Sequence, residues 1–280
     1  MSHMNEPRKR VRVPSLKEKK LRGEKITVLT AYDCTMAGLM DRAGIDVLLV
    51  GDSLGMVVLG HEDTLSVTLD TMVEHTSAVA RGARQALVVS DMPFLSYQVD
   101  LGEAVRNAGR LIQGGAAAVK IEGGSSIIID VARRLVAIGI PVMGHLGLTP
   151  QSVHQLGGFR PQAQTSESAD QLLREAKSLE EAGVFSIVLE SIPSELAKRV
   201  TAELAIPTIG IGAGPHCDGQ VLVSYDTFGL FQGSVPPFVK QYAQLGDQIL
   251  EATRTYIEDV RTGRFPTVEE DQASDRKKPR

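Results

Sequence analysis

The sequence predicts a closed (β/α)8 barrel, the TIM-barrel fold, as a single catalytic domain. Eight short aliphatic runs alternate with segments of helical periodicity, which is the pattern of parallel strands joined by helices. The chain has 280 residues, a length that suits one such barrel. Four of the runs lead directly into an acidic residue, and the carboxyl ends of barrel strands converge on one mouth. We therefore expect the functional site at that mouth.

The strand candidates are short and rich in Val, Ile and Leu, and most are bounded by glycine or a polar residue. Because such uninterrupted aliphatic runs have no polar side, we expect them to be buried on both faces. The runs are Ile26–Ala31, Val47–Gly51, Ala86–Asp91, Ala117–Glu122, Pro141–Gly144, Ser186–Glu190, Thr208–Gly212 and Thr227–Phe231.

The intervening segments place apolar residues three or four positions apart, which predicts amphipathic helices. The predicted helices are Thr35–Ala43, Leu69–Arg81, Gly102–Ile112, Ser126–Ile138, Ala169–Glu181 and Ser194–Leu204. Glycines just past four of these segments predict helix ends closed by a residue with positive φ. They are Gly44, Gly114, Gly139 and Gly183.

Two further helices are expected outside this repeat. The basic segment 5–25 is interpreted as a lead-in helix, with a nucleic-acid-binding arm as the alternative. Apolar residues recur at helical steps from Phe238 to Val260 and predict a long C-terminal helix, which covers the barrel or packs on another subunit. The expected organisation is an N-terminal extension over 1–13, a catalytic barrel over 14–265 and a disordered tail over 266–280.

Composition argues against two classes of partner. The net charge is −4 and the pI is about 5.9, so no global basic field attracts nucleic acid. The chain contains no apolar run of about eighteen residues and no signal-peptide pattern at its N-terminus. We therefore expect a cytoplasmic protein without nucleic-acid or membrane partners.

A glycine-rich segment, Gly210–Gly214, superficially matches a dinucleotide-binding fingerprint. It follows the seventh strand and lacks the usual spacing and the later acidic residue, which disfavours an open dinucleotide-binding sheet. In a barrel, such glycines let the backbone approach a ligand, including a phosphate, or support close packing.

Acidic residues at the strand ends suggest a metal site. Asp52 follows the second strand, and Asp91 and Glu122 end the third and fourth, so the three provide the hard oxygen ligands that suit Mg²⁺. No soft ligand accompanies them, which disfavours zinc and copper. The structural alternative for any single carboxylate is a helix cap or a salt bridge.

Lys120 and Glu122 are separated by one residue, so in a strand they point to the same side. If that side is the barrel interior, each charge needs a partner, because an unpaired buried charge is costly. A metal ion and an anionic substrate would supply these partners. A buried salt bridge between Lys120 and a carboxylate is the alternative.

Six segments, found in order between about residues 14 and 265, together resemble the ketopantoate hydroxymethyltransferase family. They are Leu29–Asp33, Val50–Val57, Asp91–Phe94, Val119–Gly124, Gly144–Gln151 and Ile209–Gly214. The resemblance implies a barrel of the phosphoenolpyruvate/pyruvate superfamily. It implies an enzyme that uses Mg²⁺ and 5,10-methylenetetrahydrofolate to add a hydroxymethyl group to 3-methyl-2-oxobutanoate, in the synthesis of pantothenate and coenzyme A.

The resemblance also implies residue roles by position. Asp52 and Asp91 match metal ligands that also contact the substrate, and Glu122 matches an acid that completes the metal site directly or through water. Ser53 and Lys120 match groups that hold the substrate carboxylate. Glu190 matches the catalytic acid/base, and His145 matches a pocket residue whose role is left open. The family further implies a homo-oligomer, in particular a decamer.

Two other functions remain as alternatives. Another Mg²⁺-dependent 2-oxo acid carbon–carbon lyase or mutase of the same superfamily would share the metal acids but not the folate dependence. A catalytically idle barrel that serves as a scaffold is the other. Loops 53–67 and 149–166 are rich in glycine and polar residues and are lid candidates, with ordinary surface loops as the alternative.

Overall fold

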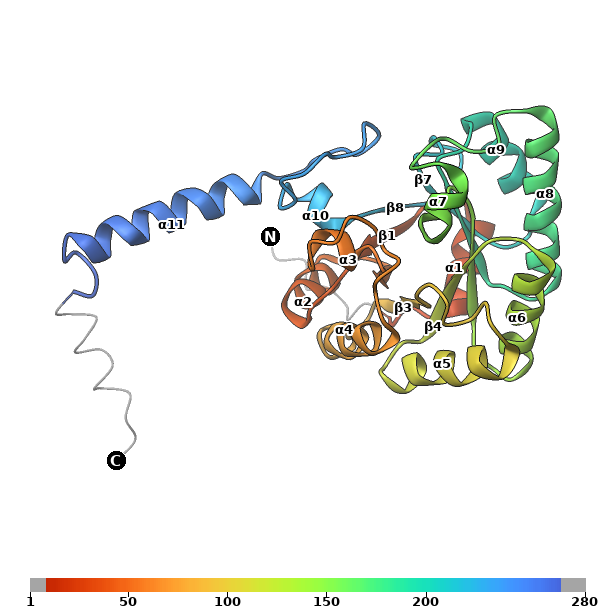
Figure 1. The fold of residues 1–280 in the computed structure, drawn as a ribbon, viewed down its shortest axis with the longest axis horizontal. Helices are drawn as coiled ribbons and strands as arrows, with labels where there is room; N and C mark the ends of the chain where they lie inside the picture. The colour runs from red at the N-terminus through yellow and green to blue at the C-terminus, as the bar shows by residue number, and fades with distance from the viewer. Residues whose placement is uncertain (1–8, 268–280) are drawn as a thin grey trace. The chain divides into compact units, whose positions relative to one another are not determined.

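The computed structural model describes residues 9–267 (Figure 1). It contains two compact units, one ending at Ser224 and the other beginning at Tyr225. Most of the predicted tail 266–280 and of the predicted extension 1–13 lies outside the described residues, and this three-part division of the chain stays a prediction.

The first unit is a closed barrel of eight parallel strands in chain order, with helices around the outside (Figure 1). Pairing of the first and last strands closes it, with Ile26 opposite Gly219 and Leu29 opposite Leu222. The strands are β1 (Ile26–Thr30), β2 (Val47–Val50), β3 (Leu87–Asp91), β4 (Ala118–Glu122), β5 (Val142–Gly147), β6 (Ser186–Glu190), β7 (Thr208–Ile211) and β8 (Gly219–Leu222). The predicted fold class is confirmed.

The six predicted helices form within a few residues of their expected bounds. They are α2 (Cys34–Ala43), α4 (Leu69–Gly82), α5 (Leu101–Gln113), α6 (Ser126–Ala137), α8 (Ser166–Glu181) and α9 (Ser194–Glu203). Five begin at a cap whose side chain accepts the backbone N–H three residues on, which satisfies an otherwise unpaired donor. These caps are Asp33, Thr68, Asp100, Ser125 and Thr165.

Three of the four glycines expected at helix ends have positive φ: Gly44, Gly139 and Gly183. The fourth does not, because Gly114 ends α5 with φ −68° and the left-handed residue is the next one, Gly115, with φ 111°. The expectation was therefore wrong by one position at this helix.

The eighth strand lies earlier in the chain than predicted. The run Thr227–Phe231 is not a strand, since Thr227 ends the short helix α10 (Ser224–Thr227) and the following residues turn. The strand is Gly219–Leu222, which contains only two aliphatic residues, so a search for aliphatic runs missed it. Glycine is needed at its start, because a Cβ at Gly219 would lie 2.7 Å from Cδ1 of Ile209 on β7.

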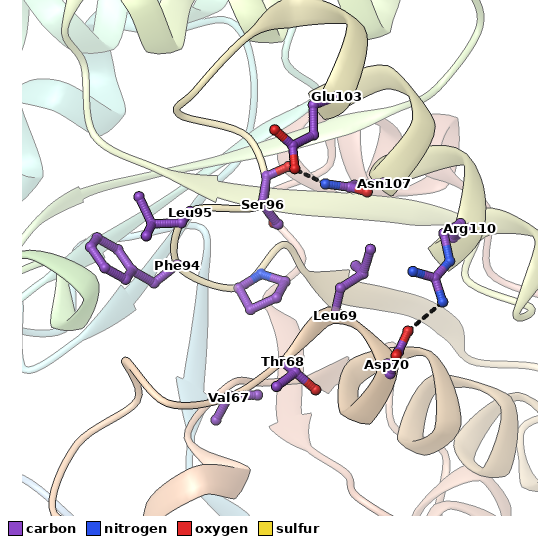
Figure 2. Close-up of a pocket in the computed structure, with 11 residues that line it drawn as sticks. Val67, Thr68, Leu69, Asp70, Phe94, Leu95, Ser96, Glu103, Asn107 and Arg110 are labelled. Carbon is purple, nitrogen blue, oxygen red and sulfur yellow. Dashed lines mark hydrogen bonds and ion pairs between the residues drawn. The ribbon is translucent and has the colours of Figure 1, made fainter.

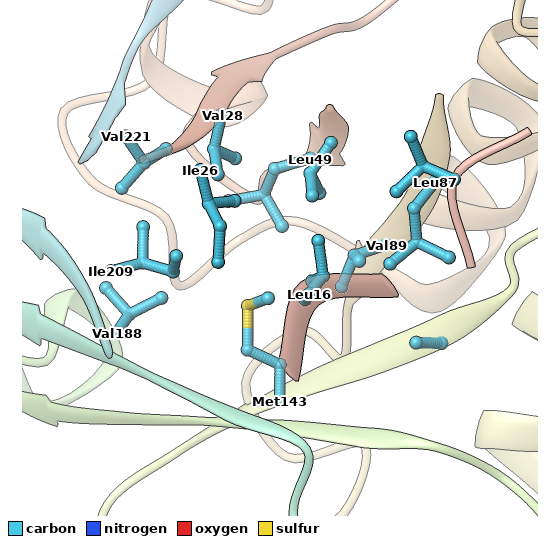
Figure 3. Close-up of a cluster of buried hydrophobic side chains, with 13 residues drawn as sticks. Leu16, Ile26, Val28, Leu49, Leu87, Val89, Met143, Val188, Ile209 and Val221 are labelled. Carbon is cyan, nitrogen blue, oxygen red and sulfur yellow. The ribbon is translucent and has the colours of Figure 1, made fainter. Parts of the chain in front are cut away.

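The lead-in helix α1 (Val13–Leu21) forms as predicted, and it lies at the amino-terminal end of the barrel, where its lysines contact residues that precede β2, β7 and β8. Its Leu16 is fully buried among the inward-facing side chains of the strands (Figure 3). Two of its basic residues pair with the barrel instead of facing solvent: Lys19 Nζ lies 3.0 Å from Asp46 Oδ1, and Lys20 Nζ lies 2.9 Å from Asp218 Oδ2. These contacts favour a structural role over a nucleic-acid arm.

Truncating the buried side chain of α1 should destabilise the barrel. We expect Leu16→Ala to lower the free energy of unfolding by about 2–5 kcal/mol, because the cavity it leaves lies in a packed core. The matched control is Leu21→Ala on the same helix, where the side chain is 77% exposed and the change should stay within about 0.5 kcal/mol. Urea unfolding of both variants measures the difference, and equal losses would contradict this packing.

In the second unit, helix α11 spans Leu245–Arg261, and none of its residues is buried. The predicted helical pattern began too early, at Phe238. Two backbone N–H groups in the expected helix bond to residues far back in the chain instead of to a carbonyl four residues earlier. Tyr242 N donates to Thr227 O at 2.8 Å, and Leu245 N donates to Phe228 O at 2.9 Å. Over residues 9–267, no helix is long and apolar enough to cross a membrane.

Candidate active site

The inward-facing side chains of the barrel change from apolar to charged near the carboxyl ends of the strands. Ala118 belongs to the apolar core, and Lys120 and Glu122 follow it on the same face of β4, so both charges point into the barrel. The same step of two residues leads from Val89 to Asp91, from Met143 to His145 and from Val188 to Glu190. Asp52 joins them from just after β2, which places all the predicted charged residues at one mouth.

Lys120 lies between buried carboxylates. Its Nζ is 3.0 Å from Asp91 Oδ1 and 3.6 Å from Glu122 Oε1. The second oxygen of Asp91, Oδ2, accepts the backbone N–H of Asp52 at 3.1 Å, which holds the ends of β2 and β3 together. The buried lysine–carboxylate bridge considered as an alternative is therefore present, and it forms part of a larger cluster.

His145 links the two sides of this mouth. Its Nδ1 lies 3.2 Å from Glu122 Oε1, and its Nε2 lies 3.1 Å from Glu190 Oε2 without the alignment of a hydrogen bond. Glu190 is less deeply buried than the others, with 15% of its side chain exposed, so it stands where the cluster meets solvent. A carboxylate at this boundary can exchange protons with a bound molecule and with water.

Ser53 lies beside the cluster, next to Asp52. Its Oγ is 2.9 Å from the hydroxyl of Tyr32, and either oxygen can be the donor. Tyr32 is buried just after β1. This contact orients the serine hydroxyl at the mouth, although Tyr32 was not among the predicted site residues.

Burial raises the pKa values of both Asp52 and Asp91. It raises the pKa of Asp52 well above its usual range, and the nearby carboxylates of Asp91 and Glu122 raise it further. Burial also raises the pKa of Asp91, although Lys120 opposes the shift. For Lys120 itself, burial would lower the pKa, but the surrounding carboxylates raise it, so the ammonium stays charged.

Glu122 and His145 are the second buried pair of the cluster, and each keeps the other in its charged form. Burial would raise the pKa of Glu122, but His145 and Lys120 keep it below its usual value. Burial and Lys120 would lower the pKa of His145, but contacts with Glu122 and Glu190 raise it to about 9. At neutral pH, the imidazole is therefore protonated.

The residues present fit a hard divalent cation. Asp91 Oδ1 is buried, and its partner among the described residues is the ammonium of Lys120, at 3.0 Å. Asp52, Asp91 and Glu122 bring three buried carboxylates close to this one ammonium, and a cation would balance their charge. No three His, Cys, Asp or Glu side chains within residues 9–267 are arranged as a ready-made metal cage. Mg²⁺ does not require one, because it binds through one or two carboxylates and completes its shell with water and substrate oxygens.

Two residues that we did not predict complete the site. Gln151, in the short 3₁₀ helix η1 (Pro150–Ser152), and Tyr97, in the loop after β3, are both buried and contact the acids. Neither has a sequence periodicity that marks it. For Gln151 two signals were available: it lies shortly after a strand, and it ends the segment Gly144–Gln151 that resembles the family.

The glycine-rich segment after β7 serves close packing. A Cβ at Gly214 would clash with Ser194 at the start of α9, and φ is positive at both Gly212 and Gly214. The expected lid roles of loops 53–67 and 149–166 stay predictions, although these loops contain the short helices α3 (Leu54–Val57) and α7 (Val153–Leu156).

A hollow of about 350 Å³ lies between the loop after β3 and helices α4 and α5, and it shares no residue with the charged cluster (Figure 2). Two pairs of its polar groups bond to one another: Arg110 pairs with Asp70, and the amide of Asn107 donates to the carbonyl of Ser96 at 2.7 Å. The chemistry therefore centres on the cluster rather than on this hollow.

Comparison with known proteins agrees with this geometry. A model of the family described as ketopantoate hydroxymethyltransferase matches residues 10–268. The chain belongs to this family. It is 56% identical over 261 residues to the 3-methyl-2-oxobutanoate hydroxymethyltransferase of Syntrophomonas wolfei subsp. wolfei, covering 93% of this chain and 94% of the relative. The enzyme of that name from Syntrophus aciditrophicus is 58% identical over 248 residues, which is 88% of this chain and 91% of the relative. The resemblance found in the sequence is confirmed.

Solved structures of other enzymes share the fold. Phosphonopyruvate hydrolase in complex with oxalate and Mg²⁺ aligns with a TM-score of 0.61 at 13% identity, covering 95% of this chain and 96% of that one. A 2,3-dimethylmalate lyase, a member of the PEP mutase/isocitrate lyase superfamily, aligns with a TM-score of 0.58 at 18% identity, covering 92% and 90%. At these identities the likeness concerns the barrel alone.

Proposed function

We propose that this protein transfers a hydroxymethyl group from 5,10-methylenetetrahydrofolate to 3-methyl-2-oxobutanoate, which gives 2-dehydropantoate for pantothenate and coenzyme A synthesis. The observation that supports this most strongly is the buried cluster of acids around Lys120 at the barrel mouth, in a member of the ketopantoate hydroxymethyltransferase family. The cluster combines a place for a cation with a buried ammonium group, and a 2-oxo acid offers a carboxylate and a keto oxygen to both.

Asp52 and Asp91 are the proposed metal ligands. Glu122 would act through water, because its Oε1 already contacts His145 and its Oε2 accepts the backbone N–H of Gln151 at 3.1 Å. Mg²⁺ bound there would draw electron density from the keto oxygen and so favour loss of the C3 proton. The ammonium of Lys120 and the hydroxyl of Ser53 are the proposed partners of the substrate carboxylate.

Glu190 is the proposed acid/base. It faces His145 across the mouth from the metal acids, so it can reach the carbon end of a substrate that is anchored on the other side. When the C3–H bond breaks, the resulting enolate forms a bond to the one-carbon unit. Both carbon–nitrogen bonds that hold the one-carbon unit to the folate break, and water supplies the new hydroxyl group. The proton taken from C3 and the remaining proton of water end on the two folate nitrogens, which gives tetrahydrofolate. The protonated His145 holds Glu190 in place by charge.

Product analysis tests this reaction. Full-length protein with Mg²⁺, 3-methyl-2-oxobutanoate and methylenetetrahydrofolate should form 2-dehydropantoate, and EDTA should stop it. If the 2-oxo acid is cleaved or rearranged without folate, the protein is instead a lyase or mutase of the superfamily. If neither reaction occurs, the scaffold function is the one that remains.

We also propose a cytoplasmic homo-oligomer, in particular a decamer, on the strength of the family. Helix α11 supports self-association, because it has no buried residue and exposes large apolar side chains. These are Ile249, Leu250, Tyr256, Ile257 and Val260. Light scattering measures the mass of the particle, and a monomer at working concentration would contradict the proposal.

A further inference from the structure

Gln151 connects the carboxyl ends of several strands. It is 5% exposed and lies just after β5. Its Nε2 donates to Asp52 Oδ2 and to the carbonyl oxygen of Met92, both at 2.9 Å. Its backbone N–H donates to Glu122 Oε2 at 3.1 Å. One residue of a loop therefore bonds directly to two of the proposed metal-site acids.

The direction of these hydrogen bonds is fixed by Tyr97. The phenol oxygen accepts the backbone N–H of Glu122 at 3.0 Å, so its single proton is free for another acceptor. The shorter of its two possible bonds is to Gln151 Oε1, at 2.8 Å, against 3.4 Å to the Glu122 carbonyl. Because Oε1 is the acceptor here, Nε2 must point at Asp52 and Met92.

The reverse orientation of the amide is excluded by its neighbours. It would place Oε1 against the carbonyl of Met92, which never has a proton to give, and against Asp52, which has none in the ionised form that binds a metal. In the observed orientation, both Nε2 protons are used, and Oε1 accepts a second bond from Gln98 Nε2 at 3.2 Å. A fully satisfied buried network of this kind is rigid.

We propose that Gln151 is a positioning residue for the metal site: its carboxamide, aligned by Tyr97, holds Oδ2 of Asp52 so that the other oxygen stays in place for Mg²⁺. Over residues 9–267, no hydrogen bond reaches Asp52 Oδ1, so this oxygen remains available to a ligand. Gln151 does not itself bind the metal. The inference rests on the magnesium site of the proposed function, but not on the identity of the product.

Magnesium affinity of the metal-free protein is the direct readout. Gln151→Met keeps the length of the side chain and removes both Nε2 donors, and we expect Mg²⁺ to bind about 10- to 100-fold more weakly by calorimetry, as for other residues that orient metal ligands. The matched control is Gln98→Met, which removes a bond to the same Oε1 but none to Asp52, and which should bind Mg²⁺ like the wild type.

A second readout separates positioning from a structural role. In Gln151→Met, turnover should recover as Mg²⁺ is raised, whereas a merely misfolded site would not respond. If Gln151→Met fails to fold, Tyr97→Phe removes the hydroxyl that aligns the amide, together with its bond from the Glu122 backbone N–H, but leaves both Nε2 donors of Gln151 in place. It should weaken Mg²⁺ binding by a smaller factor. Wild-type Mg²⁺ affinity in a folded Gln151→Met, or equal losses in it and Gln98→Met, would overturn the inference. Failure of the wild type to form 2-dehydropantoate while it binds Mg²⁺ would instead reject the proposed reaction alone.

Discussion

Asp91→Asn should bind Mg²⁺ far more weakly than the wild type and should lose turnover. The substitution keeps the shape of the side chain but removes the charge of a buried acid that we propose as a metal ligand. We expect kcat/KM to fall by roughly a thousandfold or more, because a bound metal supplies several kcal/mol and about 1.4 kcal/mol is a factor of ten in rate. Asp52→Ala should act in the same direction.

Calorimetric Mg²⁺ titration and steady-state kinetics check this result together. The matched control is Asp130→Asn, the same chemical change at an exposed acid on α6 that pairs with Arg133, outside the charged cluster. Circular dichroism establishes that both variants fold. If Asp91→Asn retains the Mg²⁺ affinity and the activity of the wild type, Asp91 is not part of the metal site.

Glu190→Gln should bind Mg²⁺ and the 2-oxo acid normally but turn over about 10²- to 10⁴-fold more slowly, the range that general acid/base catalysis supplies. The amide keeps the volume of the carboxyl group but does not take up a proton at neutral pH. Glu190 contacts only His145 among the other charged residues of the cluster, so its replacement leaves the contacts of Asp52 and Asp91 intact.

Separate measurements of binding and of kcat decide the role of Glu190. Glu195→Gln is the control, since its carboxyl lies on α9 and is 81% exposed. Wild-type kcat in Glu190→Gln would reject the acid/base role, and a loss confined to substrate binding would assign the residue to anchoring instead.

The barrel could be predicted because seven of its strands are aliphatic runs, and the predicted helices between them show clear periodicity. The eighth strand could not, because Gly219–Leu222 is held by its pairing with β1 and β7 and has little local signal. Long-range pairing of this kind is invisible to a pattern search. The start of α11 was misplaced for a related reason, because backbone bonds from distant residues replace helical ones.

Much of the candidate site could also be predicted, because the period of two along a strand carries the inward face from the core to the mouth. Lys120 and Glu122 illustrate this, since their shared face follows from sequence alone. The contacts of Gln151 and Tyr97 could not be predicted. The two residues are 54 positions apart, in the loop after β3 and in η1, and only the closed fold brings their side chains to 2.8 Å.

In the proposed function, a metal ion held by Asp52 and Asp91 at the barrel mouth activates a 2-oxo acid. Exchange of the C3 proton of 3-methyl-2-oxobutanoate with solvent is the most direct test of this activation. NMR in D₂O, with enzyme and Mg²⁺ but no folate, follows loss of the C3 proton signal. We expect exchange with the wild type and with Asp130→Asn, and none after EDTA or with Asp91→Asn. Absence of exchange with wild-type enzyme and saturating Mg²⁺, or exchange that persists in Asp91→Asn, would contradict the proposed site.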